Sequence, residues 1–140
     1  MTALSAARST LRTEPDAAAR LPMAAAMLIY QGALVALNAT GFASKGVTAT
    51  TLKQFGRAEA TVDNLAGAAG AKEIDVRPGI FRWTNSAAAD LITTAEIGTD
   101  CFIVDDQTVA KTNGTSTRSR AGKVVGVDTV GVFVQMGPQN

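Results

Sequence analysis

Histidine is absent from this sequence, and cysteine, tryptophan and tyrosine each occur only once in its 140 residues. Without histidine, the chain lacks the side chain that serves most often as a general base and as a metal ligand. A single cysteine excludes an intrachain disulfide, and Cys101 stands in the apolar run Cys-Phe-Ile-Val, which favours a buried structural thiol over a nucleophile. We therefore expect a binding or structural protein rather than an enzyme, with no cofactor and no metal.

A strong net charge and long apolar runs are lacking too. The sequence has 13 Lys and Arg against 12 Asp and Glu, a formal net charge of +1, so no overall field points to nucleic acid or to a membrane surface. No apolar run approaches the length of a membrane span, and the first residues lack the apolar core of a signal peptide. The sequence therefore predicts a protein made in a reducing cytoplasm, without a membrane partner.

Large side chains are scarce. Aromatic residues make up 5% of the sequence, and much of its 46% hydrophobic content is alanine, which buries little surface. Glycine occurs 13 times, which is typical of a chain with many turns. This composition predicts a thin, turn-rich β domain, or one that completes its burial against neighbouring molecules.

The stretch over residues 73–86 contains the single tryptophan, and we expect it to organise the core. Ile74 and Val76 alternate with charged residues, which is the period-2 pattern of a half-buried strand. Pro78-Gly79 interrupts this pattern, because proline donates no backbone hydrogen bond and glycine accepts the angles of a bend. Beyond the interruption, Trp83 returns to an apolar face. The pattern predicts a kinked strand at the centre of the core.

Short apolar segments separated by turn residues fill most of the remaining sequence. Residues 27–30 and 33–37 predict two strands joined by a tight turn or bulge. Residues 123–127 and 130–136 predict a final hairpin. Thr93-Thr-Ala-Glu96 has the pattern of a capping box, which indicates one short helix. We therefore predict a mainly β fold, either a small β-barrel or a sandwich of short strands with one short helix.

The N-terminal residues 1–20 show no periodic pattern, and Pro15 interrupts any early helix. Two interpretations stay open. The first is a disordered terminus, and the second is an extended arm that becomes ordered against a partner through Leu4, Leu11 and Leu21. The predicted organisation is an N-terminal arm over 1–20, a β domain over 21–137 and a tail over 138–140.

Two charged blocks of opposite sign are neighbours in the sequence. From Asp90 to Asp106 there are five acidic residues and no basic one, and from Lys111 to Lys123 there are four basic residues and no acidic one. The acidic block lacks the spacing of a calcium loop, so solvated turns are its favoured interpretation. Opposite blocks suit docking between like subunits or onto a partner surface, and a solvated face explains them equally well.

Several groups of segments follow one another along the chain: Ile29-Tyr-Gln-Gly-Ala-Leu-Val-Ala-Leu37, Gly56-Arg-Ala-Glu59 with Val62-Asp-Asn64, Val76-Arg-Pro-Gly-Ile-Phe-Arg-Trp-Thr-Asn-Ser86, Ile97-Gly-Thr-Asp-Cys-Phe-Ile-Val-Asp-Asp-Gln-Thr-Val-Ala-Lys111, and Ala121-Gly-Lys-Val-Val-Gly-Val-Asp128 with Val132-Phe-Val134. In this order they resemble the small capsid decoration, or cement, proteins of tailed bacteriophages and Mu-like prophages. The resemblance covers residues 21–136 and lies in the succession of segments rather than in any single motif.

This resemblance implies a compact β domain on the outer surface of a phage capsid, built of major capsid subunits with the HK97-like fold. It also implies that the protein staples neighbouring subunits and stabilises the expanded head against the pressure of packaged DNA. A homotrimer at three-fold positions is the first expectation, and a homodimer at two-fold positions the second. The implied location is the virion, after assembly in the host cytoplasm, with no direct contact to nucleic acid.

We expect the arm and the basic block to supply the contacts to the capsid or to a neighbouring subunit. One alternative is a small β-barrel that binds nucleic acid or a ligand through the segment Lys111–Lys123. Against this alternative stands the lack of aromatic residues between the basic ones, because such proteins stack bases on aromatic rings. The candidate interface residues are Leu4, Arg8, Leu11, Arg12, Arg20, Arg118 and Arg120.

Overall fold

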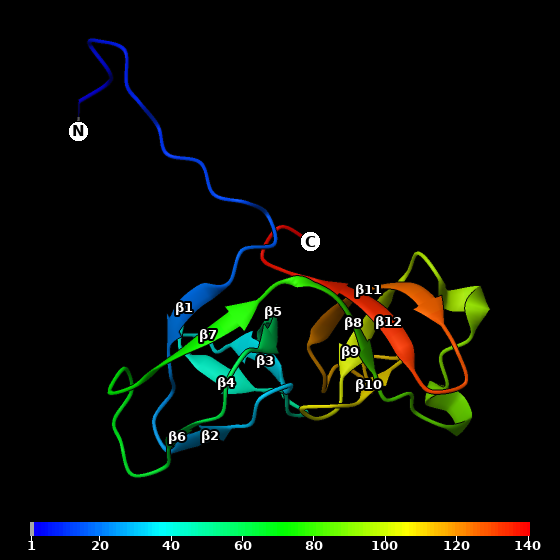
Figure 1. Ribbon diagram of the computed structural model, residues 1–140. Coiled ribbons are helices and arrows are strands. Elements are labelled where there is room, and N and C mark those ends of the chain that lie inside the picture. The colour runs from blue at the N-terminus through cyan, green and yellow to red at the C-terminus, as the bar shows by residue number, and fades with distance from the viewer. Residues whose placement is uncertain (1) are drawn as a thin grey trace.

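The chain folds into short β-strands and two 3-10 helices (Figure 1). The structure is a computed structural model, and it describes residues 2–140. The elements are β1 (Ala19–Pro22), β2 (Met27–Ile29), β3 (Leu34–Leu37), β4 (Ala43–Lys45), β5 (Lys53–Ala58), β6 (Val62–Asn64), β7 (Glu73–Arg77), β8 (Gly79–Trp83), η1 (Ala88–Asp90), η2 (Thr94–Glu96), β9 (Asp100–Ile103), β10 (Val109–Ala110), β11 (Arg120–Val127) and β12 (Val132–Met136).

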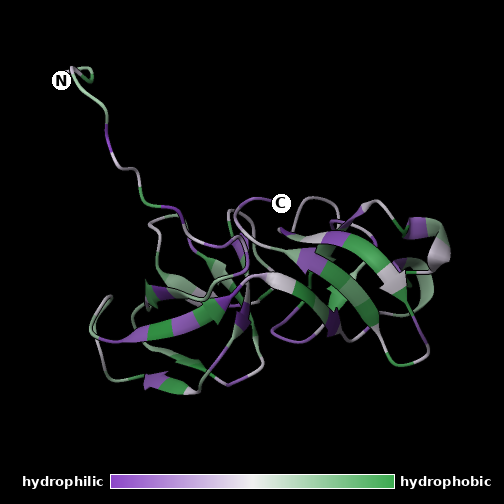
Figure 2. Ribbon diagram, turned by 45° about the horizontal axis from the view of Figure 1, so that its top comes forward, coloured by the Kyte–Doolittle hydropathy of each residue, from purple (hydrophilic) through white to green (hydrophobic). Residues whose placement is uncertain are grey.

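Two five-stranded antiparallel sheets lie side by side and form two halves of one body (Figure 1). The first sheet has the strand order β1-β7-β5-β3-β4, and the second has the order β10-β9-β11-β12-β8. A two-stranded sheet, β2-β6, lies against the first half. Along several strands, hydrophobic and hydrophilic residues alternate (Figure 2), as expected where one face of a sheet is buried.

Each five-stranded sheet is curled, so that the chain beside its first strand meets the chain beside its last strand. An isolated parallel bridge joins Met23, which follows β1, to Ala43 of β4, and a second bridge joins Thr84, after β8, to Thr108, before β10. Within residues 2–140 neither sheet closes into a barrel. The prediction of a mainly β fold of short strands is confirmed, and of its two forms the sandwich describes the molecule better than the barrel.

The predicted kinked strand is two strands, β7 and β8, that belong to different sheets. Pro78 lies between them, and the chain passes from the first half to the second at this residue (Figure 1). Ile74 and Val76 are buried in the first core, whereas Trp83 is buried in the second, where its Nε1 donates a hydrogen bond to Met136 Sδ at 3.2 Å. The predicted single core is therefore two cores, and the interruption at Pro78 joins the strand that packs in one to the strand that packs in the other.

Strand β3 contributes to both cores. Leu34 and Ala36 pack in the second core, and Val35 packs in the first, so both faces of the strand are buried. The sequence pattern predicted β2 and β3 as strands, and both are present. They do not pair with each other, however, because β3 lies between β4 and β5 while β2 pairs with β6. The turn predicted between β2 and β3 therefore connects strands of two different sheets.

Two other local predictions are confirmed. Thr93 and Glu96 form a capping box, in which the Thr93 side chain accepts from Ala95 N and Glu96 Oε2 accepts from Thr93 N, but the helix they cap is the single 3-10 turn η2. Strands β11 and β12 form the predicted antiparallel hairpin.

Among residues 2–140, no helix is long and apolar enough to cross a membrane.

Candidate interaction surface

The N-terminal arm precedes β1, and residues 2–14 project away from the body (Figures 1 and 2), whereas Pro15 and Asp16 lie against it. Leu11 is 98% exposed and Leu4 is 74% exposed, so neither leucine is covered by the rest of the chain. Arg8 and Arg12 are exposed on the same segment. Four of the candidate interface residues therefore lie together on an uncovered arm.

Arg20, the fifth candidate, belongs to the body rather than to the projecting arm. Strand β1 begins at Ala19 and pairs with β7, so Arg20 faces the acidic residues of that strand. Its Nη1 lies 3.2 Å from Asp75 Oδ1, and its Nε lies 3.8 Å from Glu73 Oε1. These exposed ion pairs contribute little to stability, and the position of Arg20 is set by the pairing of β1 with β7.

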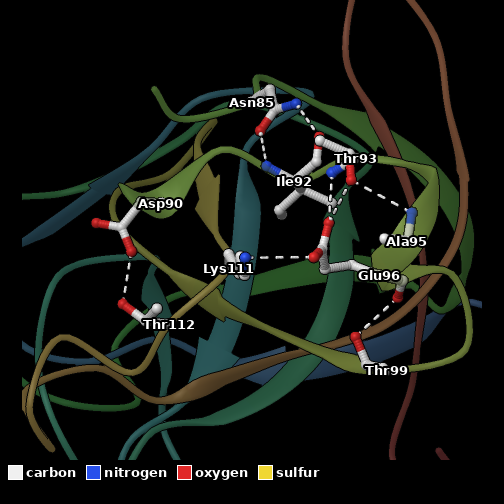
Figure 3. A network of polar contacts seen from close by, with 9 residues as sticks. All are labelled: Asn85, Asp90, Ile92, Thr93, Ala95, Glu96, Thr99, Lys111 and Thr112. Carbon is white, nitrogen blue, oxygen red and sulfur yellow. Dashed lines mark hydrogen bonds and ion pairs between the residues drawn. The ribbon is translucent and has the colours of Figure 1, made fainter. Parts of the chain in front are cut away.

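The basic block pairs with the acidic block inside one chain. Arg118 Nη1 lies 3.2 Å from Asp90 Oδ2, and Arg120 Nε lies 2.8 Å from Asp100 Oδ1. Lys111 Nζ lies 3.4 Å from Glu96 Oε1 (Figure 3). The two blocks therefore do not form separate patches of opposite sign, because three of the four basic residues have an acidic partner within the chain. Arg118 and Arg120, the remaining candidates, are engaged in this way.

Hydrogen bonds hold the acidic partners in place. Asp90 Oδ1 accepts from Thr112 Oγ1 at 2.5 Å, and this bond, together with Arg118, lowers the pKa of the Asp90 carboxyl (Figure 3). The pKa of Glu96 is lowered as well, chiefly by hydrogen bonds from Thr93 and then by Lys111. Both carboxylates are thus stabilised in their charged form.

The amide of Asn85 fixes the segment that carries these acids. Its Nδ2 donates to Ile92 O at 2.8 Å and its Oδ1 accepts from Ile92 N at 3.0 Å (Figure 3). Ile92 is 1% exposed and packs in the second core. In the segment between β8 and β9, the backbone of Ile92 is therefore held by Asn85 and its side chain by the second core. The same segment carries Asp90 and Glu96, which form the ion pairs with Arg118 and Lys111.

Within residues 2–140 the arginines of the body differ from those of the arm. The arginines of the body all have a carboxylate within 4 Å, whereas Arg8 and Arg12 of the arm have none. Of the body lysines, only Lys111 has such a partner, and Lys45, Lys53, Lys72 and Lys123 have none within residues 2–140. The body arginines with such partners are Arg20, Arg57, Arg77, Arg82, Arg118 and Arg120.

Two hollows lie beside the base of the arm, separated by the C-terminal residues 137–140. One has a volume of about 260 Å³ and is lined by Pro15 and Asp16 of the arm together with β8 and β12. The other has a volume of about 490 Å³ and lies between the two sheets. Except for Arg120, its residues were not candidates from the sequence, since they come together only when the two sheets pack. The second hollow is lined by Leu37, Leu52, Lys53, Gln54, Phe55, Arg120, Gly137, Pro138 and Asn140.

Residues 2–140 contain no cluster of three or more Cys, Asp or Glu side chains placed to hold a metal ion. Cys101 is buried, and burial raises the pKa of its thiol to about 12. This agrees with the interpretation of Cys101 as a structural thiol.

Comparison with protein-family models, with curated proteins and with solved structures finds no match for this chain. The molecule is therefore defined by its own geometry as a mainly β, sandwich-like domain with an uncovered N-terminal arm.

Proposed function

We propose that this protein is a structural component of a bacteriophage virion that binds the outer surface of the capsid and staples neighbouring major capsid subunits. In this role it stabilises the expanded head against the pressure of packaged DNA. The proposal combines the resemblance of residues 21–136 to capsid decoration proteins with the mainly β body seen here. Its partners are the major capsid protein and further copies of itself, in a trimer or a dimer.

The observation that carries the proposal is the arm. Leu4 and Leu11 are uncovered apolar side chains, and Arg8 and Arg12 are cations without a carboxylate partner among residues 2–140. A segment of this kind gains free energy by lying on another surface, where the leucines are buried and the guanidinium groups meet carboxylates. Each contact is modest, but many identical copies on one lattice bind together through multivalency.

The ion pairs within the chain argue against the alternative function, which is binding of nucleic acid through the segment Lys111–Lys123. A nucleic-acid-binding rim needs basic side chains that are available to phosphates. In the segment Lys111–Lys123 three of the four basic residues are paired with acids, and Lys123 is the exception. The small-barrel binder would have to break these pairs, so the capsid role is the better-supported one.

The test is co-sedimentation with undecorated, expanded heads of the phage that encodes the protein. We expect saturation at a fixed number of copies per particle, set by the capsid lattice, and this number distinguishes three-fold from two-fold positions. The double substitution Arg8→Gln with Arg12→Gln is expected to weaken binding, whereas Lys123→Gln, an exposed cation on the body, serves as the matched control. Absence of the protein from the pelleted heads would reject the capsid role, and a shifted DNA band at physiological salt would support the binder instead.

A further inference from the structure

The hollow between the two sheets presents uncovered apolar surface. Leu37 extends from the first core and Leu52 from the second, and both are only partly buried. Phe55 forms part of the floor at 8% exposure, and Pro138 forms one wall. A hollow of about 490 Å³ with such a lining accepts an apolar side chain together with its neighbours.

The arm leaves the body on the same face as this hollow. Pro15 and Asp16 line the neighbouring hollow, and the two hollows share Gly137, Pro138 and Asn140. In Figures 1 and 2 the base of the arm passes close to the C-terminal end of the chain. One face of the molecule therefore carries both an uncovered arm and an uncovered apolar hollow.

We propose that two copies of this protein exchange arms, with Leu11 of each arm inserted into the hollow between the sheets of the other copy. Because arm and hollow lie on one face, two copies related by a two-fold axis satisfy both contacts at once, as an isologous interface requires. This inference concerns two copies of the chain alone and does not depend on the proposed capsid function.

The base of the arm directs it away from its own hollow. Ala17 N donates to Glu14 O at 3.2 Å, which closes a turn at Pro15 and Asp16. Arg77 Nη1 donates to Asp16 O at 2.9 Å and fixes this turn to β7. With its base held, the arm extends outward (Figure 1), so that the hollow of a second copy is the available acceptor.

Two unpaired charges and the surface area of the arm are both compatible with the exchange of arms. Lys53 on the rim of the hollow and Glu14 at the root of the arm each lack an ion-pair partner within residues 2–140, and exchange brings these opposite charges to one interface. As unfolded chain of about 1.4 kDa, residues 2–14 expose about 2,000 Å². If a third of the surface of each of the two arms is buried, about 1,300 Å² of accessible surface is lost to solvent. This area exceeds the roughly 1,000 Å² of buried surface that a specific interface needs.

The first experiment joins arm and hollow by a disulfide. Leu11→Cys and Leu52→Cys are introduced into separate full-length chains, which are mixed, oxidised and digested for mass spectrometry. Since the native thiol of Cys101 is buried, a peptide pair linking positions 11 and 52 reports contact between two chains. Leu11→Cys mixed with Val130→Cys is the control, because Val130 is 66% exposed but lies away from the hollow.

We expect the 11–52 link in the mixture and no comparable 11–130 link. Equal amounts of the two links would overturn the proposal, because they indicate random collision. A chain carrying both Leu11→Cys and Leu52→Cys shows the remaining outcome. If its disulfide forms only within single chains, the arm folds onto its own body and the exchange is rejected.

The second experiment measures association by sedimentation equilibrium. The full chain is expected to form dimers, and Leu11→Asp is expected to weaken the dimer at least about tenfold, since a charged side chain replaces the inserted leucine. Leu4→Asp is the matched control outside the hollow and is expected to have a smaller effect. A full chain that stays monomeric, or one that dimerises equally well with Leu11→Asp, would contradict the exchange of arms.

Discussion

The side-chain amide of Gln54 makes two hydrogen bonds to a single residue, Gly137. Gln54 Nε2 donates to Gly137 O at 2.8 Å, and Gly137 N donates to Gln54 Oε1 at 2.7 Å. These bonds join β5 of the first sheet to the residue that follows β12 of the second. A buried polar side chain thus connects the two halves of the molecule and holds the wall between the two hollows.

Replacement of Gln54 by alanine is expected to lower the free energy of unfolding by about 1–3 kcal/mol, because the buried N–H of Gly137 loses its partner while Gly137 O keeps only the bond from Asn140 N. Urea denaturation measures this effect, and hydrogen exchange at the Gly137 amide should accelerate in parallel. Gln135→Ala is the matched control, since Gln135 is exposed and surface substitutions change stability by about 0.5 kcal/mol or less. Equal effects of the two substitutions would show that the Gln54 bonds contribute nothing specific.

Trp83→Ala is expected to lower the free energy of unfolding by about 3–5 kcal/mol, as for other large residues removed from a core. Trp83 is 5% exposed and packs in the second core against Met136 and, edge to face, against Phe81. Chemical denaturation of the variant measures the loss, and Trp83→Phe should lose less because it keeps most of the apolar volume. A nearly neutral Trp83→Ala would mean that the tryptophan is not part of the core.

The sequence predicted strand positions better than strand partners. A period-2 pattern located β7, and short apolar segments located β11 and β12, because both signals reflect burial along a single strand, which is a local property. Pairing is not local. β2 pairs with β6, whereas β3 pairs with β4 and β5, and these partners are defined only in the assembled sheets.

For the two charged blocks, too, the sequence could not predict which residues become neighbours in the fold. Asp100 and Arg120 are twenty residues apart, and they meet because β9 and β11 are antiparallel neighbours. Without that register, the sequence pattern could not distinguish docking patches from internal pairs. The sequence did mark residues 1–20 as outside the periodic pattern of the domain, because a segment without periodicity has no face to bury, but it left a disordered terminus and an arm both open.

Low pH is expected to destabilise the protein through Asp90, Glu96 and Asp128, whose pKa values are all lowered in the folded state. A lowered pKa means that the unfolded chain takes up protons first as the pH falls. The stabilisation is therefore complete above the ordinary pKa values of 3.8 for Asp and 4.5 for Glu, and it is lost as the pH falls through the lower values of the folded state.

Thermal unfolding as a function of pH checks this expectation with Asp90→Asn as the comparison. At neutral pH the variant should have the lower Tm, because Arg118 loses its ion pair. As the pH falls below the ordinary aspartate value, the two Tm values should converge, since Asp90 of the parent becomes protonated. A difference that stays constant down to low pH would exclude a contribution from the charge of Asp90.

Cys101 is expected to resist alkylation in the folded protein and to react after unfolding. Its thiol is buried, and a pKa raised to about 12 leaves almost no thiolate at neutral pH. Mass spectrometry after treatment with iodoacetamide, with and without denaturant, measures the difference. A Leu11→Cys chain provides the internal control, because position 11 on the exposed arm should be modified in both conditions. Rapid modification of Cys101 without denaturant would indicate that the second core opens readily.

Removal of the arm is expected to leave the body folded only when the deletion stops before β1. Deletion of residues 2–14 removes exposed residues, so in dilute solution, where exchange between copies does not contribute, the free energy of unfolding should change by about 0.5 kcal/mol or less. Deletion of residues 2–22 removes β1 as well, and with it Ala19 and Leu21, which pack against the first core. This second deletion should cost at least about 1 kcal/mol, because the apolar surface beneath the strand becomes exposed. Urea denaturation of the two truncated chains measures their free energies of unfolding and so locates the boundary between the arm and the folded domain. Equal stability of the two chains would place this boundary after β1 rather than before it.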